Sequence, residues 1–168
     1  MATKDSTTQS GKMEKALERV PQETEAFLEL LLNQALEAEG NFLALYEVAI
    51  RKAEAAEVKE KLEAFRDDHE RHVQEIRGTL DQLGGALLLS ALETTPFGEA
   101  VAQRLENVEG DEELLAEFLA SEELSRSLYA SLASTPAPEP VARIAQRGLA
   151  DEERHYAWAA GKLGLPKA

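Results

Sequence analysis

The stretch LADEERHYAWAAGKL, residues 149–163, places Glu152 and His155 three positions apart in a segment rich in helix-forming residues. Side chains at this spacing lie on one face of a helix, about one turn apart. A carboxylate and an imidazole placed in this way can both reach the centre of a helical bundle. The segment therefore predicts a helix from about Pro138 or Pro140 to Gly161, with a polar pair on its inward face.

Three other segments carry the same alternation of three- and four-residue spacings, which predicts helices over about 21–53, 58–83 and 111–132. Each presents one inward stripe that mixes apolar with ionisable or polar residues. The four expected stripes are Leu32, Ala35, Glu39, Phe42, Tyr46 and Ala49; Val58, Leu62, Phe65, His69, His72, Ile76 and Leu83; Leu115, Phe118, Glu122, Ser125, Tyr129 and Leu132; and Val141, Ala145, Gly148, Glu152, His155 and Ala159.

The connections between these segments predict the topology. The first two stripes differ in phase, which favours a turn near residues 53–57 over one long helix. Residues 86–110 form a long connection in which Thr95 is a candidate N-cap for a short helix beginning at Pro96, and Asp111 is a candidate N-cap for the next long helix. We expect an all-α protein: a four-helix bundle of two antiparallel hairpins joined by a long crossover with a short extra helix.

Composition limits the kind of protein. Its 168 residues suit one domain, with residues 1–20 a flexible tail and residues 21–168 the bundle. The net charge of -14 argues against nucleic acid and anionic membranes as partners. The absence of cysteine excludes thiolate metal sites. No apolar run reaches the length of a membrane span, and the N-terminus lacks the hydrophobic segment of a signal peptide, so we expect a soluble, cytoplasmic protein.

The two halves of the chain match at an offset of 83 residues, which pairs Glu39 with Glu122, His69 with Glu152, and His72 with His155. In antiparallel hairpins, these six residues enter the bundle at one level. Burying several unpaired ionisable groups costs several kcal/mol for each group unless something neutralises them. A divalent metal is the simplest solution, and mixed carboxylate and imidazole ligands suit iron or manganese.

The segments EGNFLALY (39–46), EELSRSLY (122–129) and EERHYAW (152–158) resemble helices of the rubrerythrin and ferritin-like superfamily. The resemblance extends over about residues 22–163. It implies two iron ions, with manganese or mixed metal as the alternative. It also implies the following roles: Glu39 and Glu122 as terminal carboxylate ligands, Glu152 as a bridging carboxylate, His72 and His155 as nitrogen ligands, and Tyr46 and Tyr129 as hydrogen-bond donors to the ligating carboxylates.

His69 departs from that family pattern, because it stands where the first half of the family has a second bridging glutamate. Its place on the inward stripe predicts that it ligates metal. The alternative is that its imidazole bonds Glu39 or Glu122 and replaces a missing metal with its own charge. The sequence HERH (69–72) leaves both readings open.

The resemblance implies a dinuclear redox protein that reacts with peroxide or dioxygen as a peroxidase or ferroxidase, with no catalytic residues beyond the metal ligands. Lacking cysteine, such a chain depends on an external electron donor. Two alternatives are an iron-handling protein without turnover and a structural bundle with a degenerate site. We also expect a homodimer or higher homo-oligomer, because the first helix has apolar residues beyond its inward stripe, namely Leu28, Leu31 and Leu43.

Overall fold

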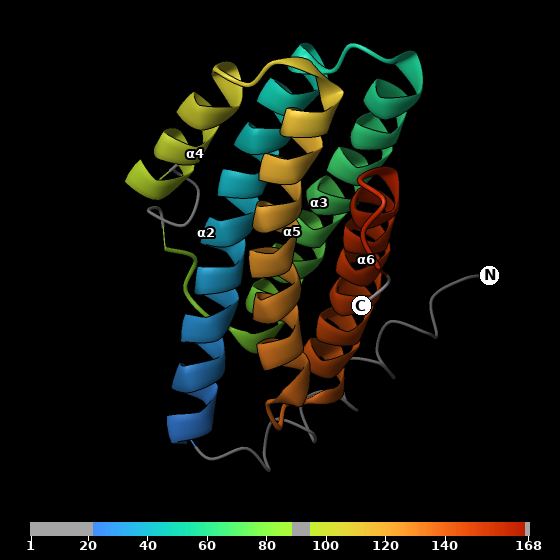
Figure 1. Ribbon diagram of the computed structural model, residues 1–168. Helices are drawn as coiled ribbons and strands as arrows, with labels where there is room; N and C mark the ends of the chain where they lie inside the picture. Colours follow the sequence, from blue (N-terminus) through green and yellow to red (C-terminus); the bar gives the residue numbers. More distant parts are fainter. Residues whose placement is uncertain (1–21, 89–94, 167–168) are drawn as a thin grey trace, which may run out of the picture.

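The computed structural model describes residues 22–88 and 95–166, and the predicted tail lies outside these ranges. Four long helices and one short helix make up the described part, with no strand in these two ranges (Figure 1). They are α2 (Gln22–Lys52), α3 (Ala56–Leu83), α4 (Pro96–Glu106), α5 (Gly110–Ser134) and α6 (Glu139–Lys162). The predicted all-α class, the helix order and the break between the first two helices are confirmed.

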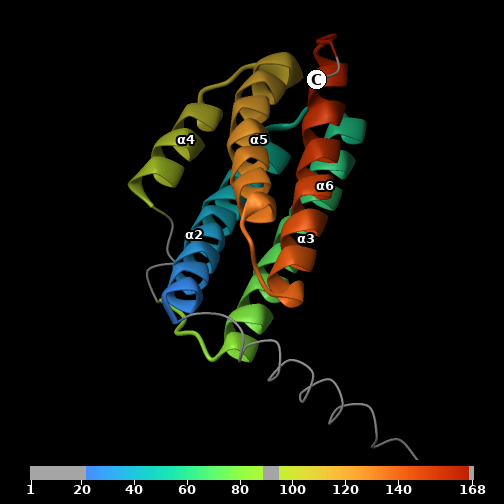
Figure 2. The same ribbon diagram turned by 90° about the horizontal axis from the view of Figure 1, so that it is seen from below.

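The long helices form a bundle of two hairpins. α2 packs against α3, α5 packs against α6, and the hairpins meet through α2–α5 and α3–α6 contacts. Figures 1 and 2 show the four helices running side by side, with α4 lying outside the bundle along α2. Helices α2 and α6 are therefore diagonal neighbours, as are α3 and α5, and side chains from all four reach one central axis.

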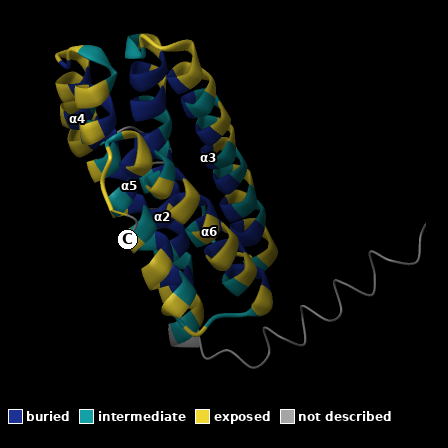
Figure 3. Ribbon diagram, turned by 45° about the vertical axis from the view of Figure 1, so that its right-hand side comes forward, coloured by how far each residue is buried: buried dark blue, intermediate teal, exposed yellow. Residues whose placement is uncertain are grey.

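The predicted inward stripes form the core. Every member is buried except Leu83, which is partly buried near the end of α3. Figure 3 shows buried residues facing the bundle interior and exposed residues on the outer surfaces. The apolar core divides into two clusters, one on each side of the buried polar residues. The helices therefore hold the ionisable residues at mid-bundle, between the two apolar clusters.

Local capping agrees with the sequence in one place and differs in another. Thr95 caps α4, accepting a hydrogen bond from the backbone N–H of Gly98. The N-cap of α5 is Glu109 rather than Asp111. Asp111 instead accepts the backbone N–H groups of Glu54 and Ala55, each at 2.9 Å. Its carboxylate thus fixes the turn between α2 and α3 and ties that turn to the start of α5.

Leu28, one of the three apolar residues on which the expected self-association rests, is not on the surface. Leu28 is 1% exposed and belongs to the core cluster that also contains Ile76 and Val141. Leu31 packs partly buried against the same cluster. More of the surface of α2 is buried than its single inward stripe predicts, because α2 lies between α3 and α5. Among the described helices, none is long and apolar enough to cross a membrane.

Candidate metal centre

The structure brings the six predicted ligands together at the middle of the bundle. Each long helix contributes at least one of them, and each side chain is at most 2% exposed. Two overlapping groups have ligand atoms close enough to hold an ion, and both contain His69 and Glu152. The first adds Glu39 and His72, and the second adds Glu122 and His155. The six residues that the 83-residue offset pairs therefore lie together at one level of the bundle.

Two tyrosines hold the outer carboxylates, each across the bundle rather than within its own hairpin. The Tyr46 hydroxyl donates to Glu122 Oε1 at 2.9 Å, and the Tyr129 hydroxyl donates to Glu39 Oε1. Tyr129 reaches Glu39 because its ring lies against Gly148, where an added Cβ would stand 2.2 Å from the ring. The buried glycine is therefore a requirement of the tyrosine's position.

The two outer histidines are held from the surface side by aspartates of the opposite hairpin. His155 Nε2 lies 3.1 Å from Asp68 Oδ2, and His72 Nε2 lies 3.2 Å from Asp151 Oδ2. With Nε2–H donated to these carboxylates, the Nδ1 atom of each ring faces the cluster. His72 Nδ1 is 3.6 Å from Glu152 Oε1, and His155 Nδ1 is 3.7 Å from Glu152 Oε2.

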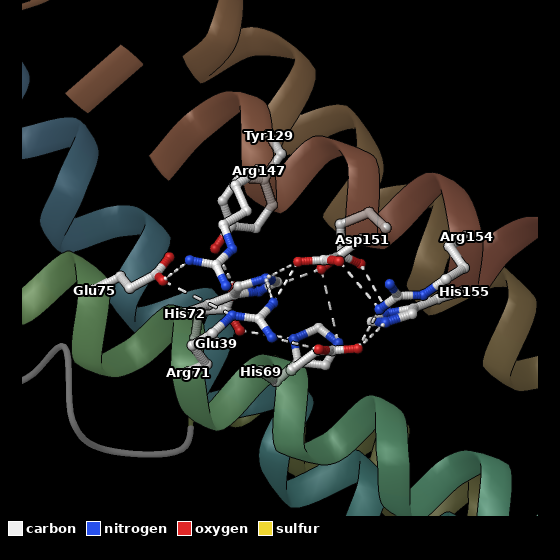
Figure 4. Close-up of polar contacts among 12 residues, drawn as sticks. Glu39, His69, Arg71, His72, Glu75, Tyr129, Arg147, Asp151, Arg154 and His155 are labelled. Atoms are coloured by element: carbon white, nitrogen blue, oxygen red, sulfur yellow. Dashed lines mark hydrogen bonds and ion pairs between the residues drawn. The ribbon is translucent and has the colours of Figure 1, made fainter. Parts of the chain in front are cut away.

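Arg71 and Arg154 complete this outer layer. Each pairs with both Asp68 and Asp151, and Figure 4 shows the arginines beside the rings of His72 and His155. None of these four residues was among the predicted site residues. Their signal was available: the segments DHERH (68–72) and DEERH (151–155) match at the 83-residue offset except at their second position. These residues lie at the edge of the stripes, so the match between inward-facing positions alone does not include them.

Aromatic side chains form the walls of the cluster. Phe65 lies over His155 with ring centroids 4.0 Å apart, and Trp158 packs edge-on against Phe65 at 5.4 Å. Phe42 and Tyr46 pack on His69, at 5.5 and 4.8 Å between centroids. These contacts keep the imidazoles in fixed orientations and exclude water from the carboxylates.

The charges of the cluster shift its titrations strongly. Burial would lower the pKa of His69, but the carboxylates of Glu152 and Glu39 raise it to about 10. Burial would likewise raise the pKa of Glu39, but His69 beside it brings the pKa to about 2. Burial would lower the pKa of His155, and its contacts with Glu122 and Glu152 raise it to about 9. The cluster therefore stabilises imidazolium and carboxylate together.

Not every polar atom of the cluster has a partner. Among the six residues, the buried atoms without a hydrogen bond are His69 Nε2, Glu122 Oε2, both oxygens of Glu152, and His155 Nδ1. Leaving a buried polar group unsatisfied costs about 1–3 kcal/mol. Atoms of this kind, all of them metal-ligand types, converge on one place, so the residues present fit a bound divalent cation.

Comparison with known proteins supports the fold. Neither protein-family models nor curated proteins give a match. Among solved structures, the chain is similar to the bacterioferritin-related protein of Bacteroides fragilis, described as a dodecameric thioferritin. The TM-score is 0.73 at 20% sequence identity, over 92% of each chain. The chain therefore has a ferritin-like fold, as the sequence predicted.

Proposed function

We propose that this protein binds iron in the buried cluster and promotes the redox reaction of that iron with peroxide or dioxygen. The observation that supports this proposal is the convergence of unsatisfied carboxylate and imidazole atoms from four helices at mid-bundle. A purely structural bundle would gain nothing from burying them without partners. We propose iron as the metal, with manganese or a mixed pair as the alternative, because the ligand set combines hard oxygen with borderline nitrogen donors.

The residues of the chain bind, orient and shield the metal. His72 and His155 present Nδ1 to the cluster because Asp151 and Asp68 fix their rings from outside. Tyr46 and Tyr129 orient the terminal carboxylates. When iron is bound, it supplies one-electron redox chemistry at a site closed to bulk water.

Electrons must come from outside this chain, because it contains no cysteine to hold an iron–sulfur centre. Reducing one peroxide to two waters takes up two protons and two electrons. Two bound ferrous ions would supply the electrons, and the protons would come from water. Sustained turnover then depends on an external donor that returns the ions to the ferrous state. A cytoplasmic location, predicted from the sequence, belongs to the same proposal.

Anaerobic loading with Fe(II) tests this function. We expect iron to remain bound after gel filtration, and peroxide or dioxygen to be consumed in proportion to the ferrous ions oxidised. Glu152→Ala is the control, since Glu152 is shared by both candidate groups. Peroxide consumption equal in the wild type and this variant would contradict the proposal.

The second candidate is iron handling without turnover, in which the protein binds ferrous iron and passes it on. A net charge of -14 favours cation accumulation near the surface, and the structural neighbour is described as a thioferritin. The same loading experiment separates the two: iron that stays bound but is not cycled by peroxide plus reductant supports handling.

We also propose that the chain forms a homo-oligomer, since the structural neighbour is described as dodecameric. Large apolar side chains exposed on the helices support this, notably Phe97, Leu124, Leu30 and Phe27. Light scattering that gives a monomeric mass at working concentration would refute it.

A further inference from the structure

The two candidate metal positions are unequal, and the difference begins at His69. This ring belongs to both groups, but a neutral imidazole has one lone pair and can ligate one ion. Its Nδ1–H donates to Glu39 Oε2 at 2.7 Å. Its Nε2 is buried without a partner and lies 3.8 Å from Glu152 Oε1. The hydrogen bond to Glu39 therefore leaves Nε2 as the ligating atom.

Glu39 is already occupied by the protein. Its Oε1 accepts the Tyr129 hydroxyl and lies 3.3 Å from His72 Nδ1, while Oε2 accepts His69 Nδ1–H. Glu122, its counterpart in the second half, accepts the Tyr46 hydroxyl on Oε1, while its buried Oε2 lies 3.4 Å from His155 Nδ1 without a hydrogen bond. A metal on the Glu39 side must therefore compete with a hydrogen bond on each carboxylate oxygen, whereas one on the Glu122 side meets an oxygen that accepts none.

The six residues have five buried atoms without a hydrogen bond, and all five belong to residues of the second group, although His69 and Glu152 are shared with the first. They are His69 Nε2, Glu122 Oε2, Glu152 Oε1 and Oε2, and His155 Nδ1. The carboxylate oxygens distinguish the two sides, because both oxygens of Glu39 accept a hydrogen bond whereas Glu122 Oε2 accepts none. The cause is position 69: an ionised glutamate there could not donate to Glu39, and each terminal carboxylate would accept only its tyrosine hydroxyl.

We propose that the centre binds one metal tightly at His69, Glu122, Glu152 and His155, with Glu39 acting as a positioning residue that holds His69 through its Nδ1–H. This rests on the proposed metal-binding function and specifies how that site fills. The Glu39 side retains only Glu39, His72 and Glu152 for a second ion, which binds weakly and exchanges.

The repeat supplies a matched pair of variants, His72→Gln and His155→Gln, that remove equivalent imidazoles on the two sides. Full-length metal-free protein is titrated with Co(II), and bound metal is measured by equilibrium dialysis and by visible absorption of the bound ion. We expect one tight equivalent per chain in the wild type and in His72→Gln, and its loss in His155→Gln. Circular dichroism and thermal unfolding of each metal-free variant check that it is folded.

Glu39→Gln and Glu122→Gln test the positioning role. Glu39→Gln should keep the single equivalent with an affinity weakened by about 10–100-fold, the usual effect of removing a partner of a metal-bound histidine. Glu122→Gln should abolish tight binding. Two equivalents of equal affinity in the wild type, or equal losses in the two histidine variants, overturn the asymmetry while leaving metal binding intact. Failure of the wild type to bind any metal overturns the proposed function itself.

Discussion

Metal binding at this centre should depend steeply on pH, because the metal-free cluster carries protons where a metal would bind. Contacts with buried carboxylates raise the pKa of His69 to about 10 and that of His155 to about 9. Both rings are therefore imidazolium in the metal-free protein at neutral pH. A metal must displace the proton on His69 Nε2 and the one on His155 Nδ1, while the other nitrogen of each ring keeps its hydrogen bond.

The steepness with which metal affinity changes with pH follows from the number of protons displaced. Each displaced proton makes the apparent affinity rise about tenfold for every pH unit below the pKa of its group, so two give roughly 100-fold per unit. The rise should continue from about pH 7 to about pH 8.5 and flatten only near the raised pKa values. Ordinary histidines, with a pKa of about 6.5, would give a plateau over the same range.

Competition of Mn(II) with a chelator of known pH dependence measures the apparent affinity. Calorimetry in buffers of different ionisation enthalpy measures the protons released. His69→Gln gives the matched control, since it removes one of the two protons and should roughly halve the slope. A slope near zero above about pH 7, or release of fewer than about one proton per metal, would refute the reasoning.

Further predictions concern single positions. Glu152→Ala should lose the tight metal and all redox turnover, since it removes the carboxylate shared by both groups; elemental analysis that finds unchanged metal would contradict this. His69→Glu should raise tight binding to two equivalents, because a carboxylate cannot donate to its neighbours and can bridge two ions; a single equivalent in dialysis would exclude this. Gly148→Ala should lower the free energy of unfolding by about 1–3 kcal/mol, because the new methyl collides with Tyr129; urea denaturation with an unchanged midpoint would argue against it. The metal-free protein should lose stability as pH rises from about 6.5 to about 9 or 10, since the raised pKa values of His69 and His155 contribute stability that is complete only below their unfolded values; melting temperatures that do not fall over this range would disprove it.

The sequence predicted the fold and the location of the cluster because both depend on periodicity. Inward stripes fix which face of each helix is buried, and the 83-residue offset fixes the level at which polar residues meet. Periodicity says less about partners on neighbouring helices. It did not indicate that Tyr46 bonds Glu122 rather than Glu39, because that choice depends on how the two hairpins cross.

Two further sets of contacts do not follow from local sequence rules for helices. Asp111 has the sequence of a helix cap, yet it binds the turn between α2 and α3, a contact that only the packed bundle creates. Asp68 is partly buried and Asp151 is buried, although both lie next to stripe positions, where most acids are simply solvated. Their sequence signal is the 83-residue match between whole segments, which extends beyond the stripe positions.

The near-symmetry of the two halves makes their one difference within the ligand set informative. Tyrosine, glutamate, aspartate, arginine and outer histidine all recur at the same offset, and only position 69 exchanges histidine for the glutamate found at 152. A carboxylate at that position could only accept hydrogen bonds, whereas an imidazole can donate from one nitrogen while the other ligates. His69 donates to Glu39, so one half of the centre satisfies its own polar atoms and the other half leaves them unsatisfied. We therefore expect this one difference to separate a position that retains a metal from one that exchanges it.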